Sequence, residues 1–204
     1  MKIAVAPAIG AGGSLFSADQ WKAIGEALGK EAKVEFTSFK QLYVDIEVER
    51  ADEVKNALLA AGLEIYPVGF FTKNLIACNF CRGAEEAGLA IALQLNEAVA
   101  GQEVPSPLKV GYAGCANATS EPLFQHIGVV KMKNGFDIYV GGEGKSIKAS
   151  VGLLMLEDVP ENAVVAVVQR LIAVYKENAR KKERFSRFVQ RITLERLREL
   201  VSTE

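Results

Sequence analysis

The residues best suited to chemistry in this sequence are three cysteines, Cys78, Cys81 and Cys115. Cys78 and Cys81 form a C-x2-C pair where a predicted strand over residues 74–77 ends, and Cys115 follows Gly114 at the end of another predicted strand, 109–113. Thiolates presented by two strand-end turns are suitable ligands for a soft metal centre. Three cysteines that only pack as small hydrophobic side chains would give the same spacing. The spacing alone favours neither interpretation.

Two kinds of metal centre are compatible with these thiols. A 4Fe–4S cluster normally takes four thiolates, one more than the sequence has. Zinc would be satisfied by the three cysteines and His126, the only histidine. The zinc site requires residues 123–125 to fold back over the cysteines, and a lone histidine between apolar neighbours is more often structural.

A glycine-rich turn gives a second chemical signal. Gly141, Gly142, Gly144 and Lys145 follow a predicted strand, and such a turn can present N–H groups and an ammonium to a phosphate or carboxylate. The P-loop spacing is absent, and a plain turn is an equally good interpretation. The glycines at 10–13 lack the spacing of a nicotinamide or flavin fingerprint, so any electrons are expected to come from a separate protein.

The first part of the chain, residues 1–69, predicts a ferredoxin-like half. Strands are expected at 2–6, 33–37, 42–48 and 63–68. Ser17 and Gln20 have the spacing of a capping box for a helix reaching about Gly29, and a second helix is expected over 50–61. The order β-α-β-β-α-β is typical of a four-stranded sheet covered by two helices.

The second part, residues 70–204, predicts a mixed α/β unit with C-terminal helices, which makes the whole chain α+β. Asn134-Gly135 between two apolar runs predicts a hairpin of 127–132 with 136–140. A further strand is expected at 152–156. Helices are expected at 84–99, from Pro160 to about 181, and over 183–200. No long linker separates the two parts, so they are expected to share a core.

Composition narrows the class of protein. The chain has 204 residues, 50% of them hydrophobic, and a formal net charge of −1. It contains no apolar run of the ~20 residues that a membrane helix needs. An odd, small number of cysteines fits a reducing compartment, so a soluble cytoplasmic protein is expected. Residues 176–198 hold nine Lys/Arg against three Asp/Glu. Apolar residues recur there at helical spacing, which favours solvated helix faces over nucleic-acid binding.

Several segments together resemble the sulfite/nitrite reductase family, whose members carry sirohaem and a 4Fe–4S cluster. Residues 35–48 are similar to its T-x-R-Q strand, and KNLIACNFCR at 73–82 is similar to its R-N-V-x-A-C…C segment. KVGYAGCANATSE at 109–121 is similar to its K-[IF]-x-V-S-G-C-P-N-x-C motif, and Tyr139-Val140-Gly141-Gly142 resembles the Y-x-V-x-G-G that follows. The resemblance covers nearly the whole chain and corresponds to a single, unduplicated repeat.

The resemblance implies a role for particular residues. Cys78, Cys81 and Cys115 match three cluster ligands, and Thr119 stands where the fourth cysteine is expected. The first pair is C-x2-C where the family usually has C-x5-C. The positions implied for catalysis or substrate-anion contact are Lys40, Lys73 and Lys109. Those implied for cofactor binding are Asn117, Thr119, Gly141, Gly142 and Lys145. Lysine in place of a family arginine keeps the charge but loses the bidentate fork.

The resemblance implies an iron–sulfur redox protein that binds sirohaem and reduces a small oxyanion such as sulfite or nitrite, with electrons from a separate donor protein. The cluster would leave one iron without a thiolate ligand. A homodimer would reproduce the two repeats of the family's duplicated enzymes. Two alternatives stay open: a tetrapyrrole-binding protein without catalysis, and a zinc-stabilised scaffold.

Overall fold

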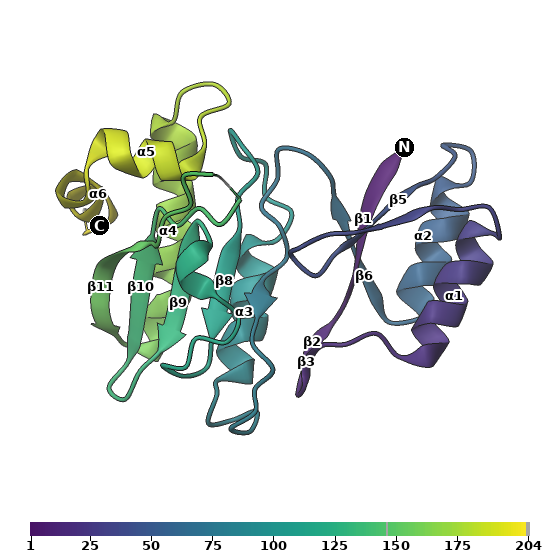
Figure 1. The fold of residues 1–204 in the computed structure, drawn as a ribbon, viewed down its shortest axis with the longest axis horizontal. Coiled ribbons are helices and arrows are strands. Elements are labelled where there is room, and N and C mark those ends of the chain that lie inside the picture. Colours follow the sequence, from purple (N-terminus) through teal and green to yellow (C-terminus); the bar gives the residue numbers. More distant parts are fainter. Residues whose placement is uncertain (146, 203–204) are drawn as a thin grey trace.

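The computed structural model describes residues 1–145 and 147–202, and shows two halves side by side (Figure 1). The first half is built on a four-stranded sheet and the second on a five-stranded sheet. Both contain helices and strands, so the α+β class is confirmed. A boundary between residues 69 and 70 remains a prediction.

The first half has the order strand, helix, strand, strand, helix, strand that the sequence predicts. Its sheet order is β4-β5-β1-β6, and all neighbouring strands are antiparallel. The elements are β1 (Lys2–Pro7), α1 (Ala18–Leu28), β4 (Val34–Phe36), β5 (Leu42–Asp45), α2 (Ala51–Ala60) and β6 (Leu63–Pro67). A two-stranded ribbon, β2 (Ile9–Gly10) and β3 (Gly13–Ser14), precedes α1.

The alternation of buried side chains along β1 shows which face of this sheet the two helices cover. Ile3 and Val5 of β1 belong to one buried cluster with Ile24 of α1 and Leu58 of α2. Successive side chains of a strand point to opposite faces, so both helices lie on the Ile3/Val5 face. The predicted ferredoxin-like arrangement is confirmed.

The capping box at the start of α1 is present as predicted. The Ser17 hydroxyl accepts the Gln20 N–H at 3.1 Å, and the Gln20 side chain accepts the Ser17 N–H at 3.0 Å. We expect Ser17→Ala to lower the free energy of unfolding by about 1 kcal/mol in urea titrations. Ser17→Asp, which keeps a good capping side chain, should stay within a few tenths of the parent protein. Equal losses in both variants would contradict this role.

The second half contains a mixed sheet of order β11-β10-β9-β8-β7. β7, β8 and β9 are parallel, while β9, β10 and β11 form an antiparallel meander. The strands are β7 (Ile76–Ala77), β8 (Val110–Ala113), β9 (Ile127–Lys131), β10 (Phe136–Val140) and β11 (Leu153–Val159). The helices are α3 (Leu89–Val99), η1 (Pro122–Phe124), α4 (Glu161–Asn178), α5 (Phe185–Ile192) and α6 (Leu194–Ser202). The predicted hairpin around Asn134-Gly135 is the β9–β10 pair.

The expectation of one shared core is wrong. The buried apolar residues form two clusters, one in each half, and only Ile9 of the first half enters the larger one. Polar contacts join the halves instead. Lys40 Nζ donates to Ala77 O at 2.7 Å, Gly12 N–H donates to Asn79 O at 3.1 Å, and Asn96 donates to the Tyr66 hydroxyl at 3.0 Å.

Two helix predictions need correction. The helix expected from residue 84 begins at Leu89, because Gly83 and Gly88 adopt positive φ values of 99° and 70° and the chain turns between them. The helix expected over 183–200 is broken into α5 and α6 at Thr193, whose φ is 75°.

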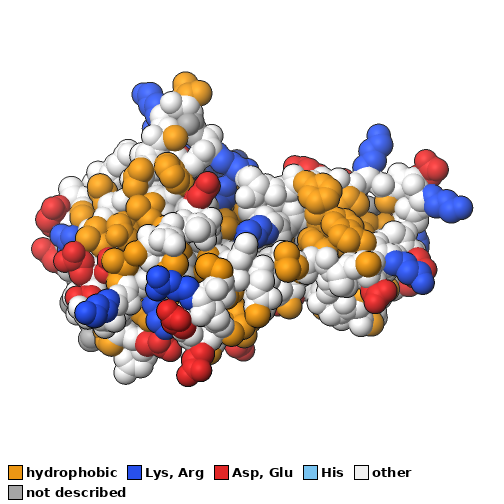
Figure 2. Space-filling model, turned by 60° about the horizontal axis from the view of Figure 1, so that its bottom comes forward, with side chains coloured by type: hydrophobic (Ala, Val, Ile, Leu, Met, Phe, Trp, Pro, Cys, Tyr) orange, Lys and Arg blue, Asp and Glu red, His pale blue; other side chains and the backbone are white. Residues whose placement is uncertain are grey.

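The surface shows one apolar feature on the first half. Phe36 is 72% exposed and its ring lies 5.8 Å from that of Trp21. Figure 2 shows hydrophobic side chains gathered on this half. Among the described residues, none of the helices has the length and apolar character needed to span a membrane.

Candidate functional site

The ends of β7 and β8 bring two of the cysteines to one place. These parallel strands pair Ile76 with Gly111 and Ala77 with Tyr112, so their carboxyl ends lie side by side. Cys78 follows β7, and its Sγ accepts the Gly114 N–H at 3.3 Å. Cys115 is the next residue after Gly114. Cys78 therefore contacts the turn that carries Cys115.

Gly114 is required by this close approach. A Cβ at this position would lie 2.4 Å from the Ala87 carbonyl oxygen. We expect Gly114→Ala to lower the free energy of unfolding by about 1–3 kcal/mol, because the turn must move away from Ala87. Gly10→Ala is the matched control, since a Cβ there meets nothing within 4 Å. Equal stability of the two variants in urea unfolding would contradict the close packing.

The third cysteine lies on the turn after β7. Cys81 is exposed, Cys115 is half-buried and Cys78 is buried. No group of three or more His, Cys, Asp and Glu in the described part of the chain has the geometry to hold a metal ion. The zinc prediction is wrong for a further reason: His126 Nδ1 accepts the Lys109 N–H at 3.0 Å, and its Nε2 faces Glu143.

A 4Fe–4S cluster makes a different demand on the same thiols. Its ligands bind separate irons, so they stand further apart than the ligands of one ion. The structure offers an N–H donor to Cys78 Sγ and a cation, Lys40, held beside it at the end of β7. Burial lowers the pKa of Lys40, and the charge of Cys78 opposes that change. Cys78 and Cys115 lie on neighbouring turns, and Cys81 follows Cys78 on the turn after β7.

The loop after Cys115 holds the other residues implied for cofactor binding at this edge. Asn117 and Thr119 are both exposed. Asn117 lines a hollow of about 570 Å³ together with Cys115 and Lys131. A threonine hydroxyl is a poor substitute for a thiolate at iron, so the resemblance implies a fourth ligand position without a thiolate at Thr119.

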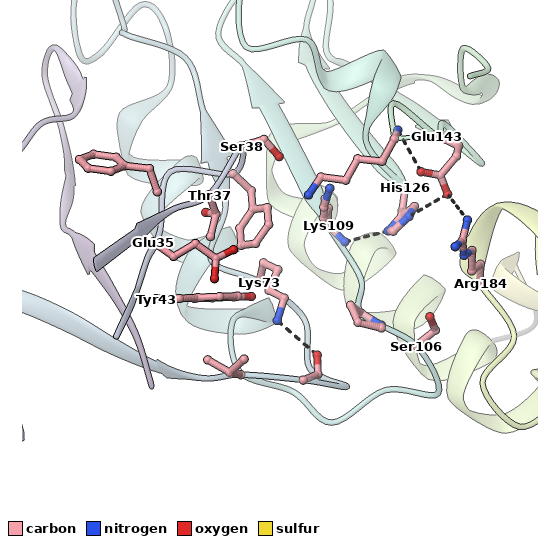
Figure 3. Close-up of a pocket in the computed structure, with 16 residues that line it drawn as sticks. Glu35, Thr37, Ser38, Tyr43, Lys73, Ser106, Lys109, His126, Glu143 and Arg184 are labelled. Carbon is pink, nitrogen blue, oxygen red and sulfur yellow. Dashed lines mark hydrogen bonds and ion pairs between the residues drawn. The ribbon is translucent and has the colours of Figure 1, made fainter. Parts of the chain in front are cut away.

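A larger cleft of about 840 Å³ lies between the two halves (Figure 3). The first half contributes the aromatic residues Phe39 and Tyr43 on one side. The second half contributes charged and polar residues on the other. The charged, histidine and aromatic residues of its wall are Glu35, Phe36, Phe39, Tyr43, Lys73, Lys109, His126, Glu143, Lys145 and Arg184.

Three lysines implied by the sequence line this cleft. The Nζ atoms of Lys109 and Lys145 lie 5.2 and 5.1 Å from the centroid of the Phe39 ring. Lys73 Nζ lies 5.8 Å from the centroid of the Tyr43 ring and donates to Gly69 O at 3.2 Å. Burial, followed by the charge of Lys145, lowers the pKa of Lys109 to about 8. The fourth lysine, Lys40, lies beside Cys78 instead.

The glycine-rich turn is not the nest of free N–H groups that the sequence suggests. The Gly141 N–H donates to His126 O at 2.8 Å, the Glu143 N–H donates to Ser150 O at 3.0 Å, and the Lys145 N–H donates to the Glu143 carboxylate at 3.2 Å. A Cβ on Gly142 would lie 2.3 Å from Gln125 O. The glycines therefore allow close packing, and Lys145 is the turn's cation in the cleft.

The sequence interpretation missed the group formed by His126, Glu143 and Arg184. Glu143 Oε2 lies 3.8 Å from His126 Nε2 and 4.0 Å from Arg184 (Figure 3). The neighbouring His126 lowers the pKa of Glu143 to about 2, together with the hydrogen bond from the Lys145 N–H and the charge of Arg184, although burial opposes this. In the sequence Glu143 stands between two glycines, and this local pattern does not predict a contact with a histidine or an arginine.

The cationic cleft and the cysteines lie at opposite ends of the same strands. Lys73 precedes β7 and Lys109 precedes β8, whereas Cys78 and Cys115 follow these strands. β8 is 4 residues long, so the Cα atoms at its two ends are about 10 Å apart. Within one chain, the cleft and the thiols are therefore two separate sites.

The comparisons with known proteins agree with this fold. Residues 75–204, more than half of the chain, match the family model of the nitrite and sulphite reductase 4Fe-4S domain. The chain therefore belongs to the nitrite and sulphite reductase family, as its motifs predict.

The individual relatives that match this chain include a methyltransferase and a sulfite reductase. The chain is 29% identical over 192 residues to a cobalt-factor III methyltransferase from Priestia megaterium, a match that covers 94% of this chain and 35% of that protein. It is 26% identical over 121 residues to an assimilatory-type sulfite reductase from Nitratidesulfovibrio vulgaris, covering 59% of this chain and 55% of the relative. The chain thus spans about a third to a half of the length of these relatives.

A solved structure confirms the fold. Dissimilatory sulfite reductase I superimposes with a TM-score of 0.78 at 12% sequence identity, and the match covers 99% of this chain and 69% of that one. At this identity the likeness establishes the fold alone.

Proposed function

We propose that this chain is an iron–sulfur redox protein whose 4Fe–4S cluster is held by Cys78, Cys81 and Cys115. The observation that carries the proposal is the contact of Cys78 Sγ with the Gly114 N–H, which joins the two cysteine-bearing turns. The cluster supplies one-electron transfer when bound. The chain's own residues stabilise its negative charge through that N–H donor and the ammonium of Lys40.

The cleft between the halves is the proposed site for an anion. Lys73, Lys109 and Lys145 converge there against Phe39 and Tyr43, so the cleft suits a small oxyanion or a carboxylate of a tetrapyrrole such as sirohaem. The aromatic rings give a flat apolar wall and the ammonium groups hold the negative charge. We propose reduction of a small oxyanion as the activity, with electrons from a separate donor protein in the cytoplasm.

A homodimer would resolve the separation of the two sites. The lysines and the cysteines lie at opposite ends of β7 and β8, so the cleft and the thiols of one chain do not face each other. In an assembly of two copies, the cleft of one copy can face the cysteines of the other. A two-fold dimer would produce two such composite sites. Light scattering that shows only monomer, at concentrations where the protein is active, would contradict this arrangement.

A second candidate function is tetrapyrrole binding without reduction of an oxyanion. The match to the cobalt-factor III methyltransferase covers 94% of this chain, compared with 59% for the sulfite reductase. That relative is named as a methyltransferase and not as a reductase, so a protein similar to this chain need not reduce an oxyanion. Cys78, Cys81 and Cys115 would then serve stability or a separate redox step.

Electron consumption distinguishes the two candidates. The full chain, reconstituted without oxygen with iron and sulfide and supplied with sirohaem, is reduced photochemically and mixed with nitrite or sulfite. We expect reoxidation that depends on the oxyanion. Sirohaem spectra that change on binding, with no reoxidation by either anion, would favour tetrapyrrole binding and contradict the reductase activity.

A further inference from the structure

Glu143 is a half-buried carboxylate placed among the cations of the cleft. Its side chain is 12% exposed, whereas the other acidic residue of the wall, Glu35, is 63% exposed and lies near Lys2 at 3.8 Å. The described wall of the cleft contains four cations, Lys73, Lys109, Lys145 and Arg184, and these two carboxylates. Glu143 is therefore the negative charge that an anion in the cleft would meet most directly.

Glu143 is fixed in this position by several donors. Its Oε1 accepts the Lys145 N–H at 3.2 Å, and its Oε2 accepts the Ser186 hydroxyl at 3.5 Å. His126 and Arg184 lie at 3.8 and 4.0 Å. The main chain of Glu143 also pairs in both directions with Ser150. A side chain held from so many sides does not leave when a ligand enters.

The fixed charge acts on the neighbouring lysines in two ways. It opposes the mutual repulsion of Lys109 and Lys145, and so favours the protonated form of Lys109. It also repels each negative charge of an incoming ligand, and because the Glu143 side chain is partly shielded from water this repulsion is stronger than in bulk solvent. With Glu143 the described side chains sum to +2, from four cations and two carboxylates. A glutamine would make that sum +3.

We propose that Glu143 is a specificity-determining residue that restricts the cleft to ligands of low negative charge. Such ligands are a singly or doubly charged oxyanion, or one or two carboxylates of a larger molecule. A cleft lined by lysines alone would favour polyanions. This inference rests on the proposed anion-binding function of the cleft and specifies the charge of the ligand that binds there.

The test is a series of anions of increasing charge titrated calorimetrically into the full chain at low ionic strength. The probes are nitrite, sulfate and citrate. We expect Glu143→Gln to tighten binding by about three- to tenfold per unit of probe charge, so that citrate gains most. Glu35→Gln removes an exposed charge from the rim and should change each affinity by less than about twofold, because solvent and salt screen it.

Other outcomes distinguish an error in the proposal for Glu143 from an error in the proposed anion-binding function of the cleft. Equal weakening of all three probes in Glu143→Gln would mean that Glu143 only supports the structure, and the proposal would be wrong. Absence of anion binding in the parent chain would contradict the proposed function of the cleft itself. If Glu143→Gln does not fold, the parent chain provides the test: it should bind citrate no more tightly than sulfate at low ionic strength, and an affinity that rises steadily with the charge of the probe would overturn the proposal.

Discussion

Cys115→Ser is expected to abolish the iron–sulfur cluster. The chain has three thiols for a cluster that normally takes four, so the loss of one leaves two ligands on a single turn. After anaerobic reconstitution and desalting, we expect bound iron and the absorbance near 400 nm to fall at least about tenfold. Iron analysis and the visible spectrum measure the effect, and circular dichroism checks the fold.

Two neighbouring substitutions serve as controls for this loss. Ala116→Ser adds a hydroxyl at an exposed position of the same turn and should leave the iron content unchanged. Thr119→Cys adds a thiol at the position implied for the fourth ligand, and should slow the loss of the cluster in air several-fold. Normal cluster content in Cys115→Ser would show that this residue is not a ligand.

The second large effect is expected at Lys109, a half-buried lysine of the cleft whose Nζ lies 5.2 Å from the centroid of the Phe39 ring. Lys109→Gln should weaken sulfate binding by about tenfold or more, because an ammonium shielded from solvent is replaced by a neutral amide. Lys30→Gln changes an exposed lysine outside the cleft and should leave binding unchanged. Isothermal titration calorimetry of the full chain measures both variants.

The pH dependence of binding follows from the lowered pKa of Lys109. The pKa is about 8, so the ammonium that attracts the anion is present below this value and is lost as the pH rises through it. Sulfate affinity in the parent chain should therefore fall above about pH 8, and this step should be absent in Lys109→Gln. An identical step in both proteins would assign the titration to another group.

Local signals explain which parts of the fold could be predicted. Ser17 and Gln20 determine the start of α1 by contacts within four residues, and Asn134-Gly135 determines the β9–β10 turn in the same way. The break at Thr193 has no such signal, because neither glycine nor proline stands there and the positive φ value depends on how α5 and α6 pack. The separate cores depend on long-range packing and could not be deduced from linker length.

The residues of the candidate site also divide into those that have a sequence signal and those that depend on contacts between distant segments. Lys73, Lys109 and Lys145 could be selected from motifs, and the structure places them in one cleft. His126 and Glu143 could not, because their contact joins residues from two separate segments of the sheet unit. The sequence therefore leaves His126 open as a zinc ligand, whereas in the structure its Nδ1 accepts the Lys109 N–H.

The most direct test of the iron–sulfur proposal is the electron paramagnetic resonance and visible spectrum of protein purified without oxygen, recorded before and after reduction, with iron and sulfide measured per chain. A cluster held by three thiolates predicts three to four irons per chain, loss of one iron on mild oxidation, and a signal from the resulting three-iron form. A spectrum without visible bands, and no bound iron after reconstitution, would contradict the proposal.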